Sequence, residues 1–279
     1  MKVLGIVSSP RKGGNSELAV KEMMMNLPSD WEKEMIRLNE LELKNCTACY
    51  KCLPEDARCP LDDDLNFYID KVRSADKVIM AGPAYCYGGH TSFKVSVDRM
   101  LAVSANYEEF CDKECVLAGF YGDEGCDGFL KEDMLIAAKQ FNMKVVDSAV
   151  MLATLPGDSV KGDNLETVRK LAKALVEGQP MVEVPEQEIL CPACSARTLQ
   201  ITTGSTWRCV LCGAEGTVKT DGERLSLLVG MAPSHFTKSE RAAQNDYRDE
   251  KKKLFIETRK EVKALQAKYA EMDIWVKPE

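Results

Sequence analysis

Four cysteines lie within fourteen residues in the first part of the chain, at the spacing C-x2-C-x2-C-x6-C. They are Cys46, Cys49, Cys52 and Cys59. Four thiolates on one short loop can enclose a cubane iron–sulfur cluster, whereas structural zinc more often takes two ligands from each of two separate turns. We therefore expect a 4Fe–4S cluster at this loop. The alternatives are a zinc site and a group of cysteines that binds nothing.

A second group of cysteines follows the spacing C-x2-C-x14-C-x2-C and consists of Cys191, Cys194, Cys209 and Cys212. Two such pairs separated by a hairpin-sized insert are typical of a zinc ribbon. Thiolate tetrads of this kind also bind a single iron, so zinc is the expectation and mononuclear iron the alternative. We expect strands over Ile201–Trp207 and Gly216–Thr220 and a structural role. A docking surface for an electron-transfer partner is the functional alternative.

A third feature is the segment Ser8–Ser16, which joins an apolar strand to a helix. Its glycines let backbone N–H groups converge, and the helix N-terminus favours an anion. The hydroxyls of Ser9 and Ser16, the amide of Asn15 and the charge of Arg11 add donors. Neither a G-K-[ST] ending nor a G-x-G-x-x-G fingerprint is present. A phosphate monoester is therefore the expected ligand, and a plain strand–helix turn is the alternative.

Short apolar segments alternate with helical segments over the first part of the chain, which predicts a doubly wound, five-stranded parallel sheet of the α/β class. Ligands of such sheets bind beyond the carboxyl ends of the strands, so the loops after the first, third and fourth strands should form the site. The expected strands are 2–7, 34–38, 77–81, 115–121 and 144–151, and the expected helices 15–26, 92–103, 127–141 and 165–176, with another helix starting near 62–64.

Composition limits the class of protein. The chain has 279 residues, is 45% hydrophobic and carries a formal net charge of −7, so a nucleic-acid partner is not expected. We find no apolar run long enough to span a membrane and no export signal, and expect a cytoplasmic protein. Twelve cysteines without an export signal suggest metal ligands rather than disulfides. The two histidines leave little material for histidine chemistry.

The last part of the chain is expected to form a long helix. A capping box at Thr237 and Glu240 begins a long charged helix through Met272. Its apolar residues recur at near-heptad spacing, so the helix either docks on its own chain, which we expect, or dimerises. These apolar residues are Phe255, Val262, Leu265, Tyr269 and Met272. The sequence therefore predicts four consecutive regions: an α/β domain at 1–178, a linker at 179–188, a ribbon at 189–229 and a helical extension at 230–279.

The motif S-P-R-K-G-G-N-S after an apolar first strand resembles the flavodoxin-like, NADPH-dependent FMN reductases. Together with the cysteine loop, residues 1–178 are similar to the iron–sulfur flavoproteins of anaerobic archaea and bacteria. The resemblance implies that FMN phosphate lies in the first loop and its ring against segment 82–89, with the cluster near the edge of the ring. The FMN-binding residues that it implies are Ser9, Arg11, Lys12, Gly14, Asn15, Ser16, Pro83, Ala84, Tyr85, Cys86, Tyr87, Gly88, Tyr121 and Gly122.

The implied activity is electron transfer between a ferredoxin-like or nicotinamide donor and an acceptor that the sequence does not identify. The resemblance also implies a homo-oligomer, either a dimer or a tetramer. One alternative is a flavin-containing redox sensor or scaffold that acts through its zinc ribbon and C-terminal helix, and another is a plain FMN reductase whose cysteine loop binds nothing. No catalytic acid or base is assigned. His90 follows the flavin segment as either a proton relay or a packing residue.

Overall fold

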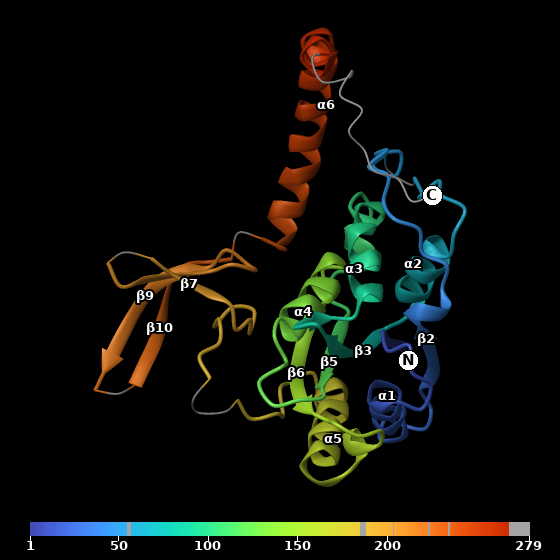
Figure 1. The fold of residues 1–279 in the computed structure, drawn as a ribbon, viewed down its shortest axis with the longest axis vertical. Coiled ribbons are helices and arrows are strands. Elements are labelled where there is room, and N and C mark those ends of the chain that lie inside the picture. Colours follow the sequence, from blue (N-terminus) through green and yellow to red (C-terminus); the bar gives the residue numbers. More distant parts are fainter. Residues whose placement is uncertain (55–56, 185–187, 203, 223, 234, 268–279) are drawn as a thin grey trace, which may run out of the picture. The chain divides into compact units, whose positions relative to one another are not determined.

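A computed structural model describes the chain except residues 55–56, 185–187, 203, 223, 234 and 268–279. By its internal contacts the chain divides into two units, Met1–Thr237 and Lys238–Glu279. The first unit contains a parallel sheet with its helices and a smaller antiparallel sheet, and the second contains one long helix (Figure 1).

The large sheet has the strand order β2-β1-β3-β5-β6, and all four of these pairings are parallel. A short strand, β4, pairs antiparallel with the end of β3. This is the strand order of a flavodoxin-like sheet, in which the order reverses between the first and third strands. The predicted fold class is therefore confirmed. The strands are β1 Lys2–Val7, β2 Glu32–Arg37, β3 Lys77–Tyr85, β4 Gly88–Gly89, β5 Glu114–Tyr121 and β6 Lys144–Leu152.

Helices cover both faces of the large sheet (Figure 1). Side chains alternate along β1, so that Leu4 and Ile6 pack with α2 and α4 while Val3 and Val7 pack with α1 and α5. All four are essentially inaccessible to solvent. The helices are α1 Asn15–Met25, α2 Leu65–Ser74, α3 Thr91–Asp98, α4 Leu130–Gln140 and α5 Gly162–Glu177, with 3-10 turns at Leu38–Glu40, Met100–Val103, Tyr107–Glu109 and Asp158–Val160.

The small sheet is antiparallel, with the order β10-β9-β8-β7. The single strand expected over Ile201–Trp207 is wrong: the segment contains a reversal, with Gly204 and Ser205 in the left-handed region. Trp207 is 1% exposed and donates its indole N–H to the carbonyl oxygen of Leu228 at 3.1 Å, which links β8 to β10 across the intervening strand β9. The strands are β7 Leu199–Thr202, β8 Thr206–Cys209, β9 Glu215–Asp221 and β10 Arg224–Met231.

The second unit contains α6, which runs from Lys238 to Ala267 and confirms the expected long helix over the described residues. Phe255 and Leu265 of the expected apolar stripe are 57% and 51% exposed within it. Two further members of the stripe, Tyr269 and Met272, lie outside the described residues. Across the described helices, none combines the length and apolar character that a bilayer crossing requires.

Candidate flavin and metal centres

The loop after β1 ends at the N-terminus of α1, whose N-cap residue is Gly14. Gly13 has φ +66°, a left-handed conformation that glycine adopts without strain. Asn15 and Ser16 lie in the first turn of the helix. The first N–H groups of a helix have no acceptor within it, and the helix dipole favours negative charge there. The loop therefore has the backbone geometry of an anion site.

The side chains of this loop divide between buried and exposed positions. Ser9 and Ser16 are buried, and Ser9 Oγ accepts the N–H of Arg11 at 3.3 Å. Arg11 is exposed, and Lys12 is 83% exposed with its Nζ 3.4 Å from Glu40 Oε1. The two cations therefore lie on the outer side of the loop, while the serines form its floor.

Arg37, at the end of β2, holds this loop in shape. Its Nη1 donates to the carbonyl oxygens of Ser9 at 2.8 Å and of Arg11 at 3.2 Å. Its Nη2 donates to Glu17 Oε2 at 2.5 Å, and the same carboxylate accepts the N–H of Gly13 at 2.7 Å. The sequence analysis missed Arg37. A cation at the carboxyl end of the strand that neighbours β1 was the available signal.

Glu17 should make the stability of this loop depend on pH. Hydrogen bonds from Lys21, the N–H of Gly13 and Arg37 hold the pKa of Glu17 at about 2. Because the folded-state pKa is lowered, the stabilisation is present above the usual carboxyl pKa and is lost as pH falls toward 2. We expect Glu17→Gln to lower the free energy of unfolding by about 1–3 kcal/mol at pH 7. Urea titrations should show this difference shrinking from pH 6 to pH 3; a difference that is independent of pH would contradict this role.

The side chain of Asn15 has a different role from the expected phosphate donor. Its Nδ2 donates to the carbonyl oxygens of Ala153 and Leu155, each at 3.0 Å. Its Oδ1 accepts the N–H groups of Gly157 at 2.8 Å and Ser159 at 3.3 Å. The amide therefore ties the first loop to the segment after β6, and only the backbone N–H of Asn15 is left to face an anion.

Ser8, the residue after β1, has a buried hydroxyl without a hydrogen-bond partner among the described residues. A Cβ on Gly82 would lie 2.2 Å from this oxygen and 2.4 Å from Cε2 of Phe93, so the position requires glycine. The resemblance gave no account of this glycine, whereas the packing does. The unpaired hydroxyl and the first N–H groups of α1, which have no acceptor within the helix, fit a polar ligand at this edge of the sheet.

The segment expected to be a loop after the third strand is a hairpin. β3 extends to Tyr85 and pairs with β4, and Cys86 and Tyr87 form the turn with φ of +49° and +64°. Tyr85 and Tyr87 are 47% and 62% exposed, so both rings offer open aromatic faces. Such faces suit a flat ligand. The expected flavin residues Pro83, Ala84 and Tyr85 are in β3, Cys86 and Tyr87 are in the turn, and Gly88 is in β4.

His90 lies at the N-terminus of α3, directly after this hairpin. Its Nδ1 accepts the N–H of Ser92 at 3.2 Å, and its ring packs edge-on against Tyr85 with centroids 4.9 Å apart. Burial lowers the pKa of His90. The described contacts are those of a helix cap that also supports Tyr85, and they account for the residue without a proton transfer.

The third expected loop begins at the end of β5 with Tyr121 and Gly122. The carbonyl oxygen of Tyr121 accepts the N–H of Ala153 at 2.8 Å, and that of Gly122 accepts the Thr154 hydroxyl at 2.6 Å. Burial raises the pKa of Tyr121. These contacts place the loop after β5 beside the segment that Asn15 holds. The structure thus brings all three predicted loops to the carboxyl edge of the sheet.

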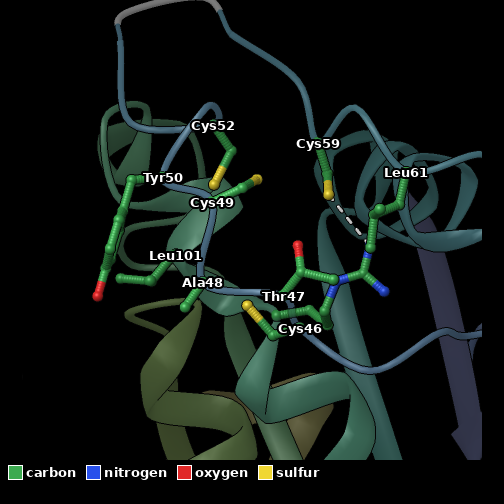
Figure 2. Close-up of a pocket in the computed structure, with 10 residues that line it drawn as sticks. Cys46, Thr47, Ala48, Cys49, Tyr50, Cys52, Cys59, Leu61 and Leu101 are labelled. Carbon is green, nitrogen blue, oxygen red and sulfur yellow. Dashed lines mark hydrogen bonds between the residues drawn. The ribbon is translucent and has the colours of Figure 1, made fainter. Parts of the chain in front are cut away.

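The cysteine loop surrounds a pocket in which the side chains of Cys46, Cys49, Cys52 and Cys59 face a common space (Figure 2). Cys46 and Cys49 are exposed, while Cys52 and Cys59 are partly buried. A hydrogen bond from the Lys51 backbone N–H, with a second from the Thr47 hydroxyl, lowers the pKa of Cys49. Among the described residues, no three of these four sulfur atoms all lie within 4.8 Å of one another. A multi-iron cluster, which spreads its ligands, fits this pocket better than a single ion.

A buried ion pair closes the base of this pocket. Arg99 is 2% exposed and donates from Nη2 to Cys59 Sγ at 3.1 Å and from Nη1 to Asp63 Oδ2 at 2.7 Å. Arg99 also donates to the carbonyl oxygen of Lys44, on the opposite arm of the loop. Although burial acts to raise it, the bonds from Arg99 and from the Lys44 and Leu65 N–H groups lower the pKa of Asp63 overall. The sequence analysis missed both residues of the pair.

The ribbon cysteines form a compact tetrad. The Sγ atoms of Cys191, Cys194, Cys209 and Cys212 all lie within 4.8 Å of one another, and all four residues are buried. The sulfur atoms of Cys191 and Cys212 are 3.7 Å apart, and those of Cys194 and Cys209 are 3.6 Å apart. Four sulfurs at about 2.3 Å from one tetrahedral ion would be about 3.8 Å apart. The predicted second metal site is therefore pre-formed for a single ion.

The fold and these sites define the class of flavodoxin-like FMN reductases. The chain belongs to the NADPH-dependent FMN reductase family, whose family model matches residues 1–156. It is 37% identical over 100 residues to an iron–sulfur flavoprotein of Methanocaldococcus jannaschii, across 36% of this chain and 51% of the relative. An iron–sulfur flavoprotein of Archaeoglobus fulgidus is 27% identical over 181 residues, across 63% of this chain and 80% of the relative. The first of these matches thus spans about half the length of the relative.

One solved structure, described as a flavone reductase, is similar over 100% of both chains, with a TM-score of 0.73 and 22% identity. At this identity the likeness shows the fold alone. The family model ends at residue 156, but this structural match also includes the regions beyond it.

Proposed function

We propose that this protein is an iron–sulfur flavoprotein: an oxidoreductase that passes electrons from a reduced donor, either ferredoxin-like or NAD(P)H, to an acceptor through FMN and a 4Fe–4S cluster. The observation that carries the proposal is the placement of two sites on adjacent strands. The segment Ser8–Ser16, which we call the anion loop, follows β1, and the cysteine loop follows β2. These two strands are parallel neighbours. Their following segments therefore begin at the same edge of the sheet.

When bound, FMN exchanges one or two electrons and the cluster exchanges one, which lets such a protein connect two-electron donors with one-electron partners. The chain's own residues supply binding and orientation. The N–H groups at the start of α1 would hold the phosphate, with Arg37 fixing the loop. Tyr85 and Tyr87 would face the ring, and the four loop cysteines would hold the cluster.

Exposure of the cysteine pocket supports exchange with an external partner. Cys46 and Cys49 are exposed, and Tyr50 beside them is 59% exposed. A cluster held at the surface is accessible to a donor or acceptor protein, while one buried on all sides is not. The ribbon tetrad, in contrast, is buried on every ligand, and we assign it zinc with a structural role, mononuclear iron being the alternative.

A second candidate function is a flavin-containing redox sensor or scaffold in which α6 engages another copy or another protein. The favouring observation is the exposure of Leu254, Phe255 and Ile256, which are 47%, 57% and 63% exposed within their unit. A homo-oligomer, as the resemblance implies, would also use such a surface. Reduction that changes the oligomeric state without steady turnover would favour this candidate.

The proposed function is tested by anaerobic reduction of protein loaded with FMN and iron. With NADH or chemically reduced ferredoxin as the donor, we expect both the flavin absorbance and the broader iron–sulfur absorbance to bleach and to return when an acceptor is added. If the flavin is reduced and reoxidised while the iron–sulfur absorbance never changes, the proposed role of the cluster is wrong and the protein is a plain FMN reductase.

A further inference from the structure

Arg197 of the ribbon contacts the segment that follows β5, at the carboxyl edge of the large sheet. Arg197 lies three residues after the metal ligand Cys194, and its backbone N–H donates to Glu132 Oε1 at 2.7 Å. Its guanidinium group pairs with Asp127 and donates to the carbonyl oxygen of Gly128 at 3.2 Å. The side chains of Arg197, Asp127 and Glu132 are only 24%, 23% and 9% exposed. This is a partly buried, charge-assisted contact rather than a loose surface pair.

The residues that Arg197 contacts belong to the segment 127–133, which we call the bridging segment. On its other side this segment contacts the hairpin of β3 and β4 that carries Tyr85 and Tyr87, which we call the tyrosine hairpin. The N–H of Phe129 donates to the carbonyl oxygen of Tyr87 at 2.8 Å, and Asp133 Oδ2 accepts the N–H of Gly89 at 2.6 Å. A Cβ on Gly128, which has φ +50°, would lie 2.1 Å from the same Tyr87 oxygen, so the two backbones are in direct contact.

The position of Arg197 depends in turn on the metal-binding turn before it. The N–H of Cys191 donates to the carbonyl oxygen of Ala196 at 2.8 Å, and that of Ser195 donates to the carbonyl oxygen of Cys191 at 2.9 Å. An ion in the tetrad would tie this turn to the second turn, at Cys209–Cys212. Without the ion, four buried thiols would be left to hold the two turns together, which is a far weaker constraint.

We propose that the metal-bound ribbon is a structural wall of the flavin site, which orders the tyrosine hairpin through Arg197 and the bridging segment. Three layers of contact lead from the tetrad to the hairpin: the metal-binding turn, Arg197 on the bridging segment, and the bridging segment on Tyr87 and Gly89. The flavin half of this inference rests on the proposed function. The effect of the ribbon metal on the order of the hairpin does not depend on the proposed function.

The test compares full-length Arg197→Ala with Arg208→Ala by hydrogen exchange and by the dissociation constant for FMN. Arg208 is the matched control, since it lies in the same ribbon and pairs only loosely with Glu215, at 3.4 Å with both side chains nearly half exposed. We expect Arg197→Ala to keep its metal, to exchange faster over residues 84–90 and 126–133, and to bind FMN roughly tenfold more weakly. Arg208→Ala should behave as the unmodified protein.

Removing the ribbon metal from the unmodified protein with a chelator should speed exchange in the same two segments and should add little to Arg197→Ala. Unchanged exchange over 84–90 in a metal-loaded Arg197→Ala variant would overturn the proposal. Should that variant not fold, Asp127→Asn tests the same contact from the other side. If no FMN binds to any variant, the proposed function fails, while the exchange result still decides whether the ribbon orders the hairpin.

Discussion

Replacing Cys49 by alanine will remove most of the iron from the protein and leave FMN bound. Three thiolates cannot complete a four-ligand cluster, and Cys49 is one of two exposed ligands, with its thiolate favoured by the Lys51 N–H and the Thr47 hydroxyl. The anion loop lies after a different strand and shares no hydrogen bond with Cys49 among those described. Iron analysis and flavin fluorescence on anaerobically purified protein measure the two effects.

Cys111→Ala is the matched control, because Cys111 is a partly buried cysteine outside both tetrads and donates to a backbone carbonyl group. It should retain both iron and FMN. Joint loss of iron and FMN from Cys49→Ala would show that the two sites are not separate. Full retention of iron would show that the cysteine loop is not the cluster site.

Replacing Arg99 by methionine will destabilise the protein more than any surface change near the cysteine loop. The Asp63 side chain is fully buried and the Arg99 side chain is 1% exposed, so the variant leaves an unpaired buried carboxylate. Removing one partner of a buried ion pair costs about 3–5 kcal/mol. It also removes the donor to Cys59 Sγ and the bond to Lys44, so the cluster should be lost more readily on chelation.

Urea unfolding of iron-free protein isolates the ion-pair effect from cluster binding. The double variant Arg99→Met with Asp63→Asn should recover part of the lost stability, because no unpaired charge then remains. Arg73→Met is the control: Arg73 pairs with Asp70 and Glu109 while 37% exposed, and its loss should cost within about 1 kcal/mol. An Arg99→Met variant as stable as the unmodified protein would contradict the role given to this pair.

The elements that the sequence predicted well are those fixed by local pattern. Apolar runs such as 77–81 can be recognised because a buried parallel strand has no polar face, and right-handed crossovers put the loops that follow the strands at one edge of the sheet. The two cysteine spacings are equally local. The hairpin after β3 was missed because Cys86 and Tyr87 take left-handed conformations that non-glycine residues seldom adopt.

Residues that act between distant segments left no local signal. Arg37, Arg99 and Arg197 each support a candidate site by joining elements far apart in sequence, and each resembles an ordinary surface cation when the sequence is read alone. The sheet brings Arg37 to the first loop, the end of α3 brings Arg99 to Cys59, and the ribbon brings Arg197 to Asp127. The predicted helix 92–103 is divided at Arg99: α3 ends at Asp98, and a 3-10 turn follows over Met100–Val103.

We expect one chain to hold FMN, an iron–sulfur cluster and a separate single-metal site. The most direct measurement is the content of FMN, iron, acid-labile sulfide and zinc per chain in protein purified without oxygen. We expect about one FMN, about four irons with matching sulfide, and about one zinc. Protein that holds zinc alone, and takes up neither iron nor FMN after anaerobic reconstitution, would contradict it.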